Sequence, residues 1–514
     1  MSLSQLTASP AIVRLAEPIA LTSIFPYAWA LIKRFEIGNE DDASFYAGLL
    51  ISSFALAEAS MGMYWGGLSD RIGRKPVLLL GCVGTMLSMV MVGFASNIWI
   101  ALTGRVLGGL LNGNIAVIQT MVGELVTKPE HEREFLHPLN LDGPRTWLTR
   151  RTAKAFSIMP FVWSVGTIIG PMIGGLFADP HDSYPDLFPT GSLFERFPYL
   201  LPNLMCATLL LVSILLGYFL LEETHPDMQP RISLPEDTFL AENTPLIETS
   251  DAMKRPAVDL RDDNYGTVRD RDVAQPPKQL HASIFSKRII AVVVSLSIFS
   301  YHSMSFDHLL PIFFEDDRVP IQALVNHATG SWNPLYSPGG LGLSLKAVGM
   351  IMAVQGIIAL FMQAVVFPPL AEKLGVHRLF ILVTVLHPIA YMIVPPLLWV
   401  PERFLYPAIY LVLAVRNFFS ILIYPLLLIL IKDAAPSSSV LGKINGLAAS
   451  AGAACRMVAP PVAGYLYAVG RKMDCTALAW YGSVFVAVVG SVQCFSVRDA
   501  RREEKMAEEE QHQV

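Results

Sequence analysis

Nine ionisable side chains lie in stretches of the chain that are otherwise apolar. Such a side chain costs at least about 2.5 kcal/mol at the centre of a lipid bilayer, so a set of them needs an explanation. Carboxylates and imidazoles bind and release protons, and a guanidinium group can hold a carboxylate in its ionised form. Each residue singly fits an ion pair between helices equally well, but three acids and two nearby histidines together favour proton chemistry. The nine residues are Glu17, Glu58, Arg105, His302, Asp307, His308, His387, Arg416 and Arg456.

Two of the acids lie close to prolines, which break helices. Glu17 precedes Pro18, and Asp307 lies four residues before Pro311, which has no N–H to donate to the Asp307 carbonyl. We therefore expect both acids at breaks in membrane-spanning helices, where membrane proteins build ion and ligand sites.

Twelve apolar stretches of about 20 residues or more contain these side chains. An α-helix needs that length to cross roughly 30 Å of hydrocarbon. Hydrocarbon offers the backbone no hydrogen-bond partners, so only helices or closed barrels cross it, and runs this continuous exclude the alternating strands of a barrel. The sequence therefore predicts an all-α membrane protein with twelve transmembrane helices. The expected helices are 11–32, 43–66, 76–95, 97–121, 155–178, 198–221, 288–313, 344–371, 378–398, 404–431, 440–469 and 475–496.

The composition agrees with this fold and excludes several functions. Hydrophobic residues make up 53% of the 514 residues and charged residues only 16%, whereas a soluble domain carries about a quarter charged residues. The net charge of −5 is spread over loops and predicts no nucleic-acid partner. The five cysteines lack metal-ligand spacing and no nucleotide-binding motif is present, so we expect no metal, no cofactor and no ATP.

His302 and Asp307 also spell H-x4-D, a pattern seen in membrane acyltransferases. On a continuous helix, a step of five residues turns the two side chains about 140° apart, so they cannot meet as a catalytic pair. We therefore predict that the protein is not an enzyme.

A short polar loop separates the second and third apolar stretches. We expect Asp70 to accept hydrogen bonds from the free backbone N–H groups of a nearby helix start, and the bases to face lipid headgroups or acidic partners. The bases of this loop would be explained equally well if they only fixed the orientation of the helices in the membrane, but that role does not explain the acid or the glycines of the loop. The loop reads GGLSDRIGRK, and its candidate functional residues are Gly66, Asp70, Arg71, Gly73, Arg74 and Lys75.

The second half of the chain repeats this loop. The segment PPLAEKLGVHR at 368–378 has Glu372 in place of Asp70 and Gly375 in place of Gly73, which predicts two pseudo-symmetric bundles of six helices. Seven prolines, thirteen acids and no apolar periodicity predict a flexible linker between the bundles. The predicted divisions are a bundle at 1–221, a cytoplasmic linker at 222–286, a second bundle at 287–497 and a charged cytoplasmic tail at 498–514.

Three glycines recur at every fourth position of the fifth apolar stretch. Gly166, Gly170 and Gly174 leave one helix face without side chains, so a neighbouring helix can approach the backbone closely. Pro171 removes one backbone hydrogen bond and is expected to bend the helix. Helix packing alone explains this face, but a bent, closely packed helix pair also suits a sliding surface between the two bundles.

With these motifs the chain resembles the major facilitator superfamily over nearly its whole length. The 66–75 loop, flanked by Trp65 and Pro76, is similar to that of the zinc-induced-facilitator-like branch and its fungal multidrug and metabolite relatives. Arg105, followed by glycines on the same helix face, matches the family's second signature. The antiporter motif of twelve-helix drug:proton antiporters resembles the set Ser157, Gly166, Gly170, Pro171, Gly174 and Gly175.

The resemblance implies a role for each motif. It associates Arg105 with proton coupling, and the sequence offers Glu17 or Glu58 as the partner of Arg105. It also implies that the 66–75 loop is a charge-relay latch that holds one conformation, and that the antiporter motif seals one side of the pathway. The residues expected to serve proton coupling or the substrate cavity are Glu17, Glu58, Arg105, His302, Asp307 and His308.

We therefore expect a secondary transporter that exports or sequesters a small organic molecule by proton-coupled antiport and alternating access. The alternatives are a uniporter or nutrient symporter, and a non-transporting membrane sensor on the same fold. Lys and Arg concentrate in the loops on one side of the membrane, which predicts cytoplasmic termini. We expect a monomer in a plasma or vacuolar membrane, with the lipid bilayer, a small-molecule substrate and protons as partners. The segment 127–152 is longer than the family normally has there, either as a regulatory insertion or through imperfect gene annotation.

Overall fold

The structure is a computed structural model, and the residues that it describes form part of one compact unit, Met1–His225 with Ile284–Val514. The segment 127–152, Ser157, the tail at 498–514 and nearly all of the linker at 222–286 lie outside the described residues, as do the predictions made for them. The described residues are 15–114, 117, 162, 164–221, 223, 286–320, 322, 324, 336–435 and 438–497.

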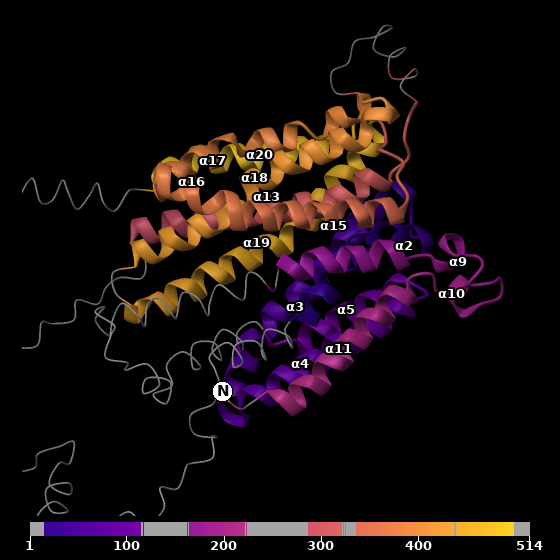
Figure 1. Ribbon diagram of the computed structural model, residues 1–514, viewed down its shortest axis with the longest axis horizontal. Helices are drawn as coiled ribbons and strands as arrows, with labels where there is room; N and C mark the ends of the chain where they lie inside the picture. Colours follow the sequence, from indigo (N-terminus) through magenta and orange to yellow (C-terminus); the bar gives the residue numbers. More distant parts are fainter. Residues whose placement is uncertain are drawn as a thin grey trace, which may run out of the picture. The chain divides into compact units, whose positions relative to one another are not determined.

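Within the described residues, the first half contains six membrane helices, of which the first is interrupted. Its two parts, 15–22 and α2, are separated by a turn at 23–27 that contains Pro26. The break that we predicted beside Glu17 and Pro18 therefore lies further along the chain, because Pro26 has no N–H to continue the helix. The other described membrane helices of this half are α3 (Ala43–Ile72), α4 (Arg74–Gly93), α5 (Ile98–Leu111), Ser164–Phe177 and α11 (Leu200–Leu220), with α2 at Ala28–Arg34. Figure 1 labels α2, α3, α4, α5 and α11 of this half. Two short helices, α9 (Pro180–Ser183) and α10 (Leu193–Arg196), precede α11.

The second half also contains six membrane helices in the described ranges. The prediction of a break near Asp307 is wrong, because α13 runs without interruption past Pro311. Buried neighbours such as Phe313 and Phe314 hold this part of the helix in place, and membrane helices tolerate an internal proline under such packing. The helices are α13 (Lys287–Glu315), α15 (Leu345–Phe361) with η4 (Met362–Val366) and α16 (Phe367–Leu374), α17 (Val376–Met392), α18 (Glu402–Ala434), α19 (Ser438–Lys472) and α20 (Ala477–Gln493).

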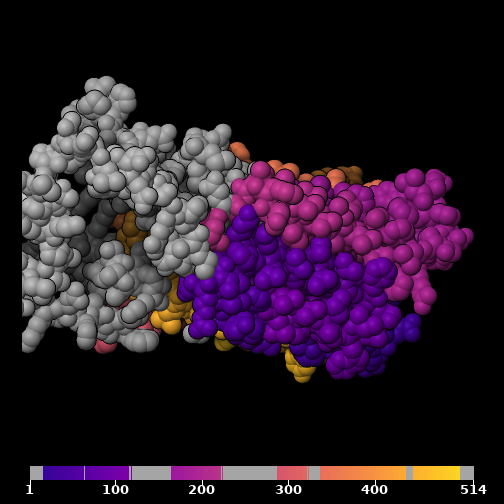
Figure 2. Space-filling model, turned by 90° about the horizontal axis from the view of Figure 1, so that it is seen from below, coloured from indigo at the N-terminus to yellow at the C-terminus, as the bar shows by residue number. Residues whose placement is uncertain are grey.

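Eight helices within the described residues are long and apolar enough to cross a membrane. Of the other four predicted helices, the first is divided by its turn, α5 ends at Leu111 before the turn at 112–114, and Ser164–Phe177 adjoins residues outside the described ranges. The fourth, α19, has 35 residues but is rich in Ala and Gly, which suits its close packing against α3 and α13. Figure 2 shows the surface of the first half in indigo and magenta. Apolar side chains of α11 such as Leu215 and Phe219 are exposed. Such an apolar surface suits contact with lipid.

The predicted repeat of the polar loop is visible in the backbone. Gly73 joins α3 to α4 with φ 99° and ψ 162°, and Gly375 joins α16 to α17 with φ 78° and ψ 150°. Positive φ favours glycine, because it has no Cβ to clash with the backbone. Both halves therefore make the same turn with the same residue type, as a duplicated bundle requires.

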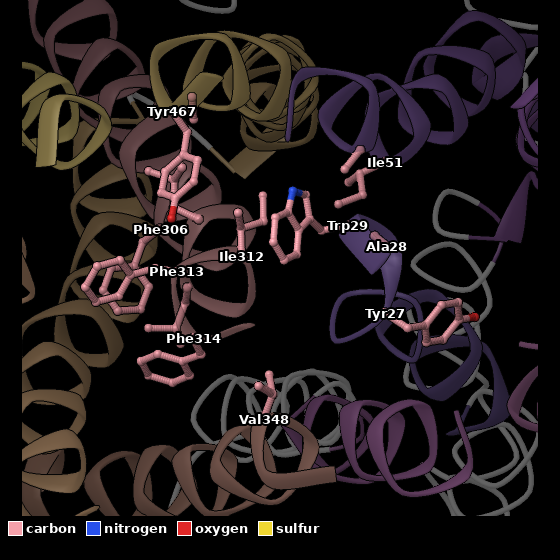
Figure 3. Close-up of a cluster of buried hydrophobic side chains, with 14 of the residues drawn as sticks. Tyr27, Ala28, Trp29, Ile51, Phe306, Ile312, Phe313, Phe314, Val348 and Tyr467 are labelled. Atoms are coloured by element: carbon pink, nitrogen blue, oxygen red, sulfur yellow. The ribbon is translucent and has the colours of Figure 1, made fainter. Parts of the chain in front are cut away.

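Buried apolar side chains form a core in each half and a third core shared between the halves. The shared core contains Tyr27, Trp29 and Ile51 from the first half and Ile312 and Phe313 from the second. In Figure 3, Trp29 and Ile312 lie side by side where the two sets of helices meet. The hydrophobic effect therefore stabilises this arrangement of the halves as well as each half itself.

The start of α3 and the end of α19 meet at one end of the molecule, here called the contact end. Ser44 Oγ donates to the Gly464 carbonyl at 2.8 Å, and a Cβ on Gly48 would lie 2.4 Å from the Pro460 carbonyl oxygen. The two backbones are thus in direct contact. Because α3 has 30 residues and is about 45 Å long, the contact end lies far from the 66–75 loop at the other end of that helix.

Candidate functional site

Glu17 lies in the interior of the first half, where the first helix passes the end of α5. Asn112 and Asn114 follow the last residue of α5. Asn112 Nδ2 donates to Glu17 Oε1 at 2.8 Å, and Asn114 Nδ2 donates to Glu17 Oε2 at 3.2 Å. Because the Glu17 residue is only 2% exposed, these two neutral amides replace the water that would otherwise solvate its carboxylate.

The two asparagines were not among our predicted residues, although the run Asn112-Gly113-Asn114 is a turn signal inside an apolar stretch. Asn112 Oδ1 accepts from the Asn114 backbone N–H at 3.0 Å, which makes a local turn that competes with the helix. A Cβ on Gly113 would lie 2.2 Å from Trp65 Cβ, and a Cβ on Gly81 would lie 2.1 Å from Asn114 Oδ1. The turn is therefore packed tightly against α3 and α4.

Arg105 lies on α5 against α3, and of its two predicted partners the structure brings Glu58 near it. The guanidinium carbon is 4.6 Å from the centre of the Phe54 ring, and Nε donates to the Leu50 carbonyl at 3.4 Å. The negative charge of Glu58 acts on the Arg105 guanidinium, whereas Glu17 binds the asparagines. The first half thus contains two separate polar groups in its interior.

Asp307 forms an ion pair with Arg416, which joins α13 to α18. Arg416 Nη2 donates to Asp307 Oδ1 at 2.7 Å and to Ser303 Oγ at 3.4 Å, and the guanidinium carbon lies 4.4 Å from the centre of the Phe306 ring. The Arg416 side chain is 6% exposed, whereas the Asp307 side chain is 41% exposed. Water and protons therefore reach the acid more readily than its buried partner.

His302 belongs to a different group from Asp307, although both lie on α13. The His302 Nδ1 atom is 2.6 Å from Tyr391 Oη, and His387 Nε2 is 3.1 Å from the same oxygen. Because a phenol has one hydrogen, Tyr391 can donate to only one of these imidazoles and must accept from the other. The H-x4-D pattern therefore forms no pair in this structure, as the helical geometry predicted. Tyr391, which joins the two histidines, was not predicted.

His308 reaches across to the first half of the chain. Its Nε2 atom lies 3.2 Å from the Ser44 carbonyl oxygen at the contact end. The six residues predicted to serve proton coupling are therefore distributed over separate groups in both halves, rather than brought together at one point.

Within the 66–75 loop, Asp70 forms an ion pair with Arg74, whose Nη1 atom also donates to Ser69 Oγ at 2.8 Å. The carboxylate that caps the start of α4 is that of Glu223, which accepts from the backbone N–H groups of Arg74 at 2.9 Å and Lys75 at 3.1 Å. The prediction that Asp70 caps a nearby helix start is therefore wrong for α4. The turn at the loop's glycine brings the Arg74 guanidinium to Asp70 instead, and Glu223 comes from beyond α11.

The remaining bases and glycines of the loop have different surroundings. Lys75 Nζ donates to the Tyr218 carbonyl at 2.7 Å, so the loop is held to α11 within its own half. Arg71 is exposed, as a contact with headgroups or an acidic partner requires. A Cβ on Gly66 would meet nothing within 4 Å, so tight packing does not explain this glycine.

The glycine face of Ser164–Phe177 packs against the first helix of the same half. A Cβ on Gly170 would lie 2.0 Å from Thr22 Oγ1, and a Cβ on Gly174 would lie 1.9 Å from the Ser23 carbonyl oxygen. Thr22 Oγ1 is also 3.2 Å from the Gly166 carbonyl oxygen, to which it donates. This face therefore packs helices together within the first half, as helix packing alone predicts, and the alternative of a sliding surface between the two bundles is wrong for these three glycines.

The neighbouring residues of the same motif make the contact between the halves. A Cβ on Gly175 would lie 2.4 Å from Gly349 Cα and 2.6 Å from the Leu345 carbonyl oxygen, both on α15. A Cβ on Gly349 would in turn lie 2.9 Å from the Pro171 carbonyl oxygen. The motif thus has two faces, one within the first half and one toward the second, which the residue spacing alone did not distinguish.

Comparison with known proteins identifies the family to which this chain is similar. The chain matches the Major Facilitator Superfamily over residues 19–325. It is 36% identical to the Major facilitator superfamily multidrug transporter mfsB of Aspergillus fumigatus, over 97% of this chain and 84% of that protein. It is 26% identical to Protein ZINC INDUCED FACILITATOR 1 of Arabidopsis thaliana, over 94% of this chain and 89% of that protein. The solved structure of the D-xylose-proton symporter has a TM-score of 0.63 at 14% identity, over 97% of this chain and 99% of that one.

The structural likeness shows the fold, and the sequence match over more than half of the chain shows the family. In the described residues, no group of three or more His, Cys, Asp or Glu side chains is arranged to hold a metal ion. The interior polar groups instead pair with one another between helices, as ionisable residues in a membrane transporter commonly do. The chain therefore belongs to the Major Facilitator Superfamily and is a multi-pass membrane protein, a secondary transporter.

Proposed function

We propose that this protein is a proton-coupled antiporter that exports or sequesters a small, moderately hydrophobic organic molecule by alternating access. In this proposal the protein is a monomer in a plasma or vacuolar membrane with both termini in the cytoplasm. The linker at 222–286 and the tail at 498–514 are then cytoplasmic segments attached to bundles at 1–221 and 287–497.

The ion pair between Asp307 and Arg416 is the observation that carries the proposal. Its acid is 41% exposed and its base 6% exposed, so a proton can reach Asp307 while Arg416 remains shielded. Protonation of Asp307 removes the only carboxylate within hydrogen-bond distance of Arg416 among the described residues. The guanidinium cannot lose its own proton in compensation.

The size of this effect is sufficient for coupling. The Asp307–Arg416 pair is only partly buried, so loss of its carboxylate charge costs less than the roughly 3–5 kcal/mol of a fully buried pair, but about 1.4 kcal/mol already changes a conformational equilibrium roughly tenfold. A conformation in which Arg416 finds water or another acceptor would be favoured by that factor once Asp307 is protonated. Proton binding at one residue can therefore change which conformation the transporter occupies.

The nature of the substrate is inferred from relatives. One relative is named a multidrug transporter, and it is 36% identical over 97% of this chain. Another, named Efflux pump azaK, from Aspergillus niger, is 28% identical over 37% of this chain. These names support export of organic molecules, whereas a nutrient symporter would move its substrate together with the proton.

Purified protein in proteoliposomes with an imposed pH gradient tests the proposal. A panel of fluorescent amphipathic compounds is screened by counterflow, and the compound with the largest signal becomes the probe. We expect wild type to accumulate the probe against its gradient when the pH gradient has the antiport direction. Asp307→Asn should lose that accumulation and keep exchange of the probe, and Asp186→Asn, which changes an exposed acid in a loop, should behave as wild type.

Four other outcomes would contradict the proposal. Accumulation driven by the opposite pH gradient indicates a symporter, and counterflow that no pH gradient drives indicates a uniporter. No counterflow with any compound of the panel, from protein that remains monodisperse, favours the sensor. Wild-type accumulation by Asp307→Asn would show that this acid does not couple transport.

A further inference from the structure

A cluster of five charged side chains joins the two halves at the contact end. Lys472 Nζ donates to Asp42 Oδ1 at 2.6 Å, and Arg471 Nε lies 3.5 Å from Asp41 Oδ1. The two acids precede α3 in η1 (Glu40–Asp42), whereas the two bases are the last residues of α19. Both ion pairs therefore connect the first half with the second.

Arg471 has a second carboxylate partner, in its own half. Its Nη1 atom lies 3.6 Å from Asp316 Oδ1, and the Asp316 side chain is fully buried at the end of α13. Asp316 Oδ2 accepts from Tyr467 Oη at 2.8 Å, and Asp316 Oδ1 accepts from the Asp317 backbone N–H at 2.9 Å. Asp316 is thus held in place by its own half, and it positions Arg471 to reach Asp41.

Close backbone contact lies next to these ion pairs. His308 on α13 and Gly464 on α19 both bond to Ser44, one at its carbonyl and the other at its hydroxyl. A Cβ on Gly464 would lie 2.2 Å from the Ser44 carbonyl oxygen. The contact leaves no room for a side chain, so a solute cannot pass between α3 and α19 here while the ion pairs hold.

We propose that Asp41, Asp42, Asp316, Arg471 and Lys472 form an ion-pair gate that holds the contact end shut and must separate each time the transporter opens on that side. The gate rests on alternating access but not on proton coupling, so it holds for a symporter or uniporter equally. Because it lies at the opposite end of α3 from the 66–75 loop, the two devices act on opposite sides of the membrane.

Charge reversal with a distance measurement tests the gate. Spin labels are placed at Trp99→Cys and Glu402→Cys, two exposed positions in different halves where α5 and α18 begin near the contact end, with Cys455→Ser to remove a partly exposed thiol. Distances between the labels are measured by pulsed electron resonance in lipid nanodiscs, without substrate or pH gradient. A failure of proton coupling therefore leaves the result unaffected.

Each single reversal, Asp42→Lys or Lys472→Asp, should raise the population with the longer distance. Loss of an exposed ion pair corresponds to about twofold to fivefold, and the like charges add to it. The double variant should return the distribution to that of wild type, and Asp186→Lys, an exposed control at another position, should not change it. Longer distances that persist in the double variant, or no change in either single variant, would overturn the proposal. Should a reversed variant fail to fold, the milder Asp42→Asn and Lys472→Gln must each lengthen the distance, and an unchanged distribution in both would equally overturn it.

Discussion

An added methyl group at Gly175 should shift the balance between the two conformations of the transporter more than it changes the stability of either half. The new Cβ would lie 2.4 Å from Gly349 Cα and 2.6 Å from the Leu345 carbonyl oxygen. Carbon atoms prefer about 3.5–4.0 Å, so the helices must separate by roughly 1 Å or more. Overpacking of this kind costs about 1–3 kcal/mol, which is about a 5- to 150-fold change in a two-state population.

Gly175→Ala is best measured against two matched glycine variants. Gly170→Ala creates an overlap of similar size, 2.0 Å from Thr22 Oγ1, but within the first half. Gly62→Ala lies in α3 and meets nothing within 4 Å. We expect Gly175→Ala to change the distances between spin labels on the two halves, Gly170→Ala to lower mainly the unfolding temperature, and Gly62→Ala to do neither.

Two results would refute this reasoning. If Gly170→Ala separates the halves as much as Gly175→Ala does, the first helix and Ser164–Phe177 transmit strain to the interface, and the two faces of the motif are not independent. If Gly175→Ala leaves both the distances and the transport rate at wild-type values, α15 moves away at no measurable cost and the contact does not control the equilibrium.

Three further predictions concern charged groups. Asp70→Asn should slow turnover for every transported compound and leave relative specificity unchanged, because the loop is far from the membrane centre; a changed order of preference among compounds would contradict this. Arg105→Lys should impair pH-dependent transport, because an ammonium group replaces the planar guanidinium stacked 4.6 Å from the Phe54 ring; full transport would reduce Arg105 to a packing residue. Burial raises the pKa of the Asp316 carboxyl, whereas Arg471, the Tyr467 hydroxyl and the Asp317 backbone N–H oppose this, and the charge of Asp317 adds to it. If opening exposes Asp316, the pKa of this carboxyl is higher in the closed state than in the open state, so protonation stabilises the closed state. This stabilisation is complete below the ordinary Asp pKa of about 4 and is lost as the pH rises through the raised pKa of the closed state. In a variant that carries Asp41→Asn and Asp42→Asn, so that these two gate carboxylates no longer titrate, lowering the pH should therefore shorten the label distance at the contact end, and a longer distance in acid would refute this role of Asp316.

Much of the architecture was predictable from local features of the chain. Twelve apolar stretches long enough to cross a bilayer led to the all-α membrane fold, because hydrocarbon permits few backbone arrangements. The repeated loop glycines, Gly73 and Gly375, indicated the duplicated bundle, and both have positive φ in the structure. The helix breaks were less predictable. A turn containing Pro26 interrupts the first helix while α13 continues past Pro311, so the presence of a proline does not by itself decide where a helix breaks.

In the candidate site, the sequence likewise predicted the residues but not their partners. Ionisable types inside apolar stretches marked Glu17, Asp307 and Arg416 from the sequence, because the membrane excludes unpaired charge. Their partners depend on which helices become neighbours: Glu17 meets Asn112 across 95 residues, and Asp307 meets Arg416 across 109. Chain periodicity holds no information about such pairs.

The sequence by itself determined that this protein is a membrane transporter built from two bundles, because span length, loop motifs and glycine spacing are local properties. The tertiary structure decided which face of each helix meets which neighbour. Gly170 faces Thr22 within one half while Gly175 faces Gly349 across the halves, and the ion pairs of Arg471 exist only because α19 ends beside η1. Side chains and backbones from distant parts of the chain must pack together without voids or overlaps, and only the folded arrangement of all the helices satisfies that condition.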